Sequence, residues 1–97
     1  MVWGEMGRAP KVNNGPGRDH WSESAFALFA GGGLQTGQVV GATDSNGLRP
    51  RTRRYGPQNV LSTLYHVLGI DPAAYLTDHS GRPMHLLDER EPITEML

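Results

Sequence analysis

The segment Gly17-Arg18-Asp19-His20-Trp21 brings together residue types that can bind a metal ion or an anion. Adjacent aspartate and histidine side chains can offer a hard oxygen and an imidazole nitrogen to zinc or a similar divalent ion. The spacing alone favours a structural role, in which Asp19 caps a turn and His20 packs beside Trp21. Both interpretations stay open at this point.

A second candidate lies near the start of the chain. Residues 1–3 are apolar and stop at Gly4, which is typical of the last residues of a β-strand. Glu5 follows directly and Arg8 comes three residues later, so Glu5 is a candidate for a cleft at a strand end. The alternative is a surface ion pair between Glu5 and Arg8, worth at most about 1 kcal/mol.

The other polar residues show no known catalytic pattern. The serines lack the Gly-x-Ser-x-Gly elbow, so a serine-hydrolase triad has no support. The six-residue separation of His79 and His85 does not match the common zinc motifs. The chain has no cysteine, which excludes disulfides, thiolate metal sites and thiol nucleophiles.

Composition argues against two classes of partner. Nine basic and ten acidic residues leave a net charge of -1, so no positive field is available to attract nucleic acid or acidic lipid. No apolar stretch approaches the length of a membrane span. With 13 glycines and 7 prolines the chain is expected to be rich in loops but globular.

These candidate residues must be positioned by a small number of elements. Residues 4–21 predict a long irregular loop, and residues 24–30 form an apolar run that predicts a strand buried on both faces of a parallel or mixed sheet. A helix is expected from Pro57 to about Leu68, with Gly69 as its stop signal. One helix cannot cover both faces of such a sheet, so either intimate oligomerisation or a longer polypeptide must supply the rest.

Read in order, the segments 2–10, 17–21, 30–33, 37–44 and 65–72 resemble the C-terminal part of a bacterial sulfatase-like family catalogued as domain of unknown function 1501. The specific motifs are Trp-Gly-Glu-x-Gly-Arg and Gly-Arg-Asp-His-Trp. The resemblance covers nearly the whole chain. It implies that residues 1–97 are the C-terminal portion of a single sulfatase-like domain. It implies an α/β fold, namely the C-terminal fragment of an alkaline phosphatase-like sandwich with a mostly parallel sheet and long loops.

The resemblance also implies a site. By analogy with the alkaline phosphatase superfamily, Glu5, Asp19 and His20 are the expected ligands of a divalent metal, either zinc or calcium or magnesium. Arg8 and Arg18 are expected to contact the ester oxygens, since guanidinium groups match that geometry. This chain departs from the pattern in having Glu5 where true phosphatases carry an Asp-His pair, and it lacks the superfamily's nucleophile.

Two functions follow from this reading. The first is a hydrolase domain that acts on sulfate or phosphate esters of small molecules or glycans. In this interpretation the chain is the C-terminal fragment of the domain, needs the missing N-terminal part, and is inactive alone. The second is a non-catalytic binding or structural domain that keeps the fold without metals. The resemblance further implies that full-length relatives are exported, and neither nucleic acid nor membrane is an expected partner.

Overall fold

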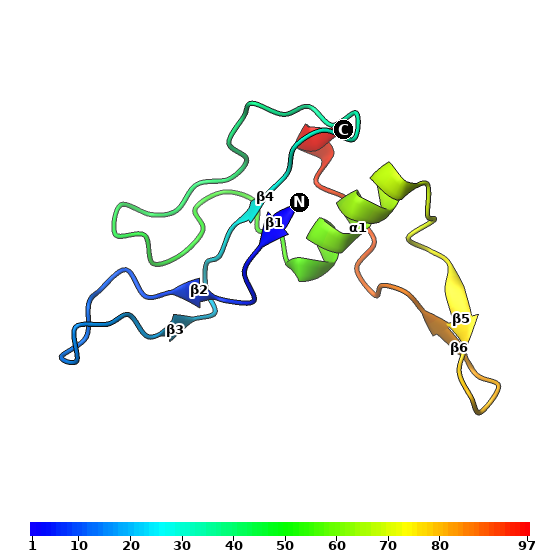
Figure 1. Cartoon of the computed structure of the whole chain (residues 1–97), viewed down its shortest axis with the longest axis horizontal. Coiled ribbons are helices and arrows are strands. Elements are labelled where there is room, and N and C mark those ends of the chain that lie inside the picture. Colours follow the sequence, from blue (N-terminus) through cyan, green and yellow to red (C-terminus); the bar gives the residue numbers. More distant parts are fainter. The chain divides into compact units, whose positions relative to one another are not determined.

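The computed structural model describes all residues, 1–97, as two compact units. The N-terminal unit contains residues 1–30 and 37–54, and the C-terminal unit contains residues 31–36 and 55–97. Figure 1 shows that the strands are short, and the chain has a single α-helix. That helix is not long and apolar enough to cross a membrane.

Two short antiparallel sheets form the N-terminal unit. Strand β1 (Val2–Trp3) pairs with β4 (Ala27–Leu28), and β2 (Gly7–Arg8) pairs with β3 (His20–Trp21). The chain therefore runs from one sheet directly into the other. The expected irregular loop over residues 4–21 contains a β-hairpin, formed by β2, β3 and their connection.

Helix α1 (Pro57–Leu68) begins and ends where local sequence signals predict, so this prediction is confirmed. Proline at its first position has a backbone already suited to a helix and lacks an N–H that would go unpaired there. Gly69 ends the helix with φ of 71°, a left-handed conformation that costs glycine little. The Ile70 N–H then donates to the carbonyl of Tyr65 at 2.9 Å, which satisfies one of the helix's terminal acceptors.

The helix buries a polar stripe as well as an apolar one. Ser62 and Thr63 have no exposed surface, and Asn59 is also buried. Their hydroxyl and amide groups bind the backbone of the C-terminal segment: Ile93 N–H donates to Thr63 Oγ1 at 2.8 Å, and Asn59 Nδ2 donates to the Glu91 carbonyl at 2.8 Å. These bonds dock the segment on α1 without leaving a buried polar atom unpaired.

The small core of the C-terminal unit is formed by residues of α1 and of the C-terminal segment, residues 87–96. Val60 from α1 is buried, and so are Leu87, Ile93 and Met96, the last within a short 3-10 helix, η1 (Thr94–Met96). Leu68, the last residue of α1, is 60% exposed and lies outside this core.

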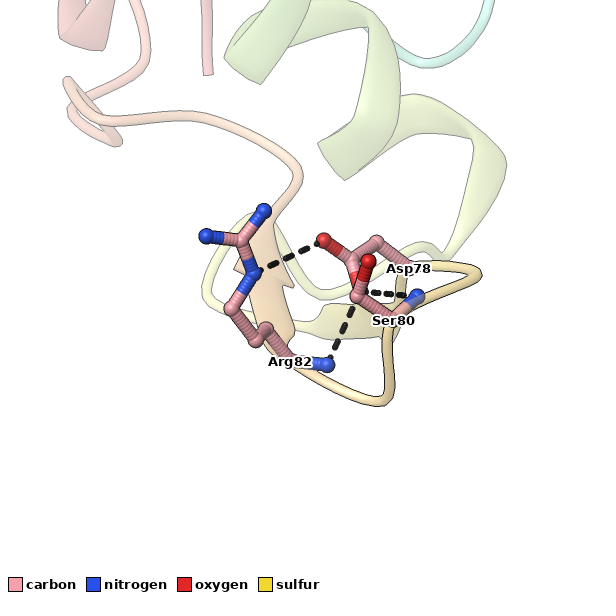
Figure 2. A network of polar contacts seen from close by, with 3 residues as sticks. All are labelled: Asp78, Ser80 and Arg82. Atoms are coloured by element: carbon pink, nitrogen blue, oxygen red, sulfur yellow. Dashed lines mark hydrogen bonds and ion pairs between the residues drawn. The ribbon is translucent and has the colours of Figure 1, made fainter.

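A hairpin completes the C-terminal unit. Strand β5 (Tyr75–Thr77) pairs antiparallel with β6 (Pro83–His85), and every residue of both strands is exposed. The carboxylate of Asp78 closes its turn by accepting hydrogen bonds from the backbone N–H groups of Ser80 and Arg82 at 2.8 and 2.9 Å (Figure 2). The Arg82 Nε also donates to Asp78 Oδ2 at 3.2 Å.

The expected mostly parallel sheet of an alkaline phosphatase-like fold is wrong for this chain, because all three sheets are two-stranded and antiparallel. Parallel neighbours need a long crossover connection, usually a helix, between two strands of one sheet. The only helix, α1, lies between β4 and β5, and these strands belong to different sheets. No crossover of the required kind is present in residues 1–97.

The apolar run at residues 24–30 also differs from its prediction as a central buried strand. Only Ala27 and Leu28 are in strand conformation, and they pair with β1 alone. Phe26 and Leu28 are 73% and 55% exposed. The run has the composition of a buried strand, but no neighbouring element within the unit covers it.

Candidate functional site

The β2–β3 hairpin places Arg8 directly opposite His20. These two residues are Cα partners in the antiparallel register, as are Gly7 and Trp21. Side chains of directly opposed residues project from the same face of a sheet, within reach of one another. Arg8 and His20 are both exposed, so a guanidinium and an imidazole lie together on one open surface, which we call the Arg8–His20 face.

Gly7 allows the hairpin to pack closely against the chain that follows β3. A Cβ atom at position 7 would lie 1.7 Å from the carbonyl oxygen of Ser24 and 2.8 Å from that of Trp21. Both neighbours are backbone atoms, which cannot move away as the end of a flexible side chain can. The second glycine of the Trp-Gly-Glu-x-Gly-Arg motif is therefore required by close backbone approach.

The connection between β2 and β3 is organised by Asn13. Its side-chain Oδ1 accepts hydrogen bonds from the backbone N–H groups of Gly15 and Gly17 at 2.9 and 3.0 Å. Its Nδ2 donates to Asp19 Oδ1 at 2.9 Å. The Asp19 carboxylate is thus fastened to the loop through Asn13, and it is Asn13, not Asp19, that binds the N–H groups of the turn.

Arg18 holds the base of the same loop. Its Nη1 donates to the carbonyl oxygen of Ala9 at 2.9 Å and also to that of Pro10. The Ala9 N–H in turn donates to the Asp19 carbonyl at 2.9 Å, which extends the β2–β3 pairing by one residue on each side. Arg18 is therefore a loop-positioning residue in this structure, and contact with a substrate stays a prediction.

The two faces of the hairpin carry different groups. Successive residues of a strand point to opposite faces, so Asp19 and Trp21 lie on the face opposite His20. An open hollow of about 420 Å³ lies on that side, and Asp19 and Trp21 are among its lining residues, whereas Arg8 and His20 are not. Asp19 and His20, which the resemblance implies as ligands of one metal ion, therefore lie on opposite faces of the hairpin.

Trp21 joins the hairpin to a second loop of the same unit. Its indole Nε1 donates to the carbonyl of Leu48 at 2.7 Å. Leu48 is held by the side chain of Asp44, whose Oδ1 accepts from the Leu48 N–H at 2.8 Å. The bridge between Thr43 and Pro50 closes the base of that loop.

The expected metal ligands do not form a complete site within this chain. No group of three or more His, Asp or Glu side chains is close enough to share a metal ion. Glu5 is exposed in the bend between β1 and β2, and Asp19 lies on the other face of the hairpin from His20. The ligand assignment of Glu5, Asp19 and His20 stays a prediction that requires further groups and a rearranged Asp19.

Sequence reasoning missed the residues that organise the loop. Asn13 was expected only to belong to an irregular stretch, yet it fixes Asp19 and two glycine N–H groups. The Asn13-Asn14-Gly15 sequence is a recognisable turn signal, since asparagine side chains readily bind backbone groups two residues on. The bond from Trp21 to Leu48 had no local signal.

Comparison with known proteins gives one match. The family model described as "Protein of unknown function (DUF1501)" matches residues 1–97. No curated protein and no solved structure matches the chain.

Proposed function

We propose, from the premise that this chain belongs to the DUF1501 family, that it forms part of a sulfatase-like hydrolase domain acting on sulfate or phosphate esters. The observation that supports the proposal is the placement of Arg8 opposite His20 on an exposed face of the β2–β3 hairpin. That this domain is of the alkaline phosphatase and sulfatase type is part of the proposal, and it is supported by the likeness of its sequence motifs.

The Arg8–His20 face has the chemistry of a site for a tetrahedral anion. A guanidinium group offers paired N–H donors that match two oxygens of a sulfate or phosphate group. The imidazole of His20 offers a further donor when it is protonated, and as a neutral group it can hold a metal ion. The strand register sets the two residues directly opposite one another, so both side chains can reach the same ester group.

The residues of this chain do not by themselves provide the chemical step. A catalytic zinc site takes three protein ligands and keeps a position for water, and the chain gathers no group of three suitable side chains. We therefore propose that Arg8 and His20 bind and orient the ester oxygens, while metal ligands and a nucleophile come from outside residues 1–97. The 97-residue chain alone is expected neither to hydrolyse an ester at a useful rate nor to bind zinc tightly.

The test is a titration of the isotope-labelled chain with phenyl sulfate and phenyl phosphate, followed by NMR. We expect saturable shifts at the His20 ring and at the Arg8 side chain, with much weaker binding in Arg8→Gln. Arg51→Gln is the matched control, because Arg51 is another exposed arginine of the same unit. Equal losses in the two variants would show that binding depends on net charge alone and would contradict the proposal.

A second function is favoured by the position of Asp19. Its carboxylate is engaged by Asn13 and lies on the opposite face from Arg8, as expected for a domain that keeps an anion contact without a metal. Such a domain binds sulfated or phosphorylated partners without cleaving them. Stoichiometric zinc together with zinc-dependent hydrolysis by the purified chain, both abolished in His20→Ala, would eliminate this alternative. The same result would contradict the expectation that the chain alone is inactive.

A further inference from the structure

The hollow on the other face of the β2–β3 hairpin combines several kinds of binding group. It measures about 420 Å³, within the range of small-ligand sites, and all its lining residues belong to the N-terminal unit. Its polar and aromatic lining residues are Trp21, Asp19, Lys11, Asn13 and Asn14, and the rest of its wall is apolar, from Ala9, Pro10, Val12 and Leu48.

Two of these groups are held in place before any ligand binds. The Trp21 ring is half-buried and is fixed by the 2.7 Å hydrogen bond from its Nε1 to Leu48. The Asp19 carboxylate is fixed through Oδ1 by the 2.9 Å bond from Asn13, while Oδ2 makes no hydrogen bond within the chain. A site with immobilised groups loses less entropy on binding than one whose side chains must first be ordered.

The charged residues of the hollow balance one another and so give no preference for a ligand of net charge. Lys11 and Asp19 contribute one positive and one negative charge, so an anion is opposed by the carboxylate and a cation by the ammonium group. The polar groups include both donors and acceptors, which suits a ligand whose own groups do both, such as a hydroxyl. The indole offers a flat apolar surface against which a ring can pack.

A neutral sugar ring has these properties together, since it presents apolar C–H faces and several hydroxyl groups. We propose that this hollow binds a neutral pyranose ring, with the ring packed on Trp21 and its hydroxyl groups bonded to Asp19 Oδ2 and the neighbouring amides. The site lies on the opposite face of the hairpin from Arg8 and His20, so the proposal stands whether or not the chain belongs to an ester hydrolase.

The experiment is an NMR titration of the full 97-residue chain with the methyl pyranosides of glucose, galactose and mannose. The chain has two tryptophans, Trp3 and Trp21, and their indole N–H signals report separately on the two sheets of the unit. At least one pyranoside should shift the Trp21 signal saturably and leave the Trp3 signal unchanged. Loss of a bond to a charged carboxylate should make binding about tenfold weaker in Asp19→Asn.

Asp19→Asn is chosen because an amide oxygen can still accept the hydrogen bond from Asn13, so the loop keeps its tie. Asp71→Asn is the matched control, since Asp71 is also an exposed turn residue whose carboxylate accepts a backbone bond, from Ala73 at 2.8 Å. The control should bind the pyranoside as the unaltered chain does. Equal weakening in both variants would overturn the assignment to this hollow.

Two further outcomes would also overturn the proposal. One is the absence of a saturable Trp21 shift with all three pyranosides. The other is binding of a sulfated monosaccharide with no binding of its neutral parent, which would place recognition at the sulfate group. That second result would leave the proposed anion site at Arg8 and His20 intact, so the two ideas fail separately.

Discussion

Trp21 and Leu48 are 27 positions apart in the chain and are joined by a 2.7 Å hydrogen bond from the indole Nε1 to the Leu48 carbonyl. We expect Trp21→Phe to keep most of the ring's packing while leaving this carbonyl without its partner. Loss of one partly buried bond should lower the free energy of unfolding by about 1–2 kcal/mol. Trp3→Phe is the control for denaturant unfolding, and an equal effect of both changes would argue against the bond's importance.

Gly7→Ala should disrupt the β2–β3 hairpin, because the added Cβ would lie 1.7 Å from the backbone oxygen of Ser24. Relief of such overpacking requires the backbone to move, at a cost of about 1–3 kcal/mol or more. Gly4→Ala is the matched control, since its nearest atom, Met6 O, is 3.9 Å away. Amide signals of His20 and Trp21 that keep their positions in Gly7→Ala would contradict this account.

Thr63→Val should loosen the C-terminal segment from α1. Valine has nearly the same shape as threonine but cannot accept the 2.8 Å bond from the buried Ile93 N–H, and a buried unpaired donor costs about 1–3 kcal/mol. Hydrogen exchange at Ile93 should therefore become faster. Thr63→Ser retains the hydroxyl and should leave that exchange close to its original rate; faster exchange in the serine variant than in the valine variant would refute the role of the bond.

The turn of the β5–β6 hairpin should weaken in acid. The hydrogen bond from the backbone N–H of Arg82 lowers the pKa of Asp78 below its ordinary value of 3.8. Partial desolvation raises the pKa, whereas the Ser80 N–H and the Arg82 side chain lower it further (Figure 2). A carboxylate with a lowered pKa stabilises the fold fully above its unfolded value and loses that contribution as the pH falls through the folded value. The turn should therefore stay intact at neutral pH and open only below about pH 3.8.

The acid transition can be followed through the amide signals of Ser80 and Arg82. Asp78→Asn removes the titrating group and should abolish the transition at this turn. Asp71→Asn, which alters a different turn, should leave it in place. A carboxyl titration of Asp78 at or above 3.8 would contradict the hydrogen-bonding account.

The parts of the fold that depend on local signals could be predicted from the sequence. Helix α1 was predicted with the same bounds, because Pro57 and Gly69 act through their own backbone preferences. The turn of the β5–β6 hairpin also depends on local signals, because Asp78, Ser80 and Gly81 are residue types that favour turns. Its closing carboxylate, Asp78, binds N–H groups only two and four residues away.

The parts that depend on distant partners could not be predicted. The apolar run at 24–30 has the composition of a buried strand, but burial depends on which elements cover it, and Phe26 stays 73% exposed. The register that sets Arg8 opposite His20 depends on the long connection between the strands, which Asn13 and Arg18 organise. Membership of the DUF1501 family, in contrast, was recognised from the short motifs at residues 3–8 and 17–21, which contain Arg8, Arg18 and His20 but not Asn13.

The most direct test of the central claim is a double-mutant cycle on Arg8 and His20, with the dissociation constant of inorganic sulfate as the readout. If the two side chains form one anion site, Arg8→Gln and His20→Gln should each weaken binding, and the double variant should lose less than the sum of the single losses. Arg8→Gln combined with Arg51→Gln provides the additive reference. Strict additivity for Arg8 and His20, or unchanged sulfate binding in either single variant, would contradict a shared site on this face of the hairpin.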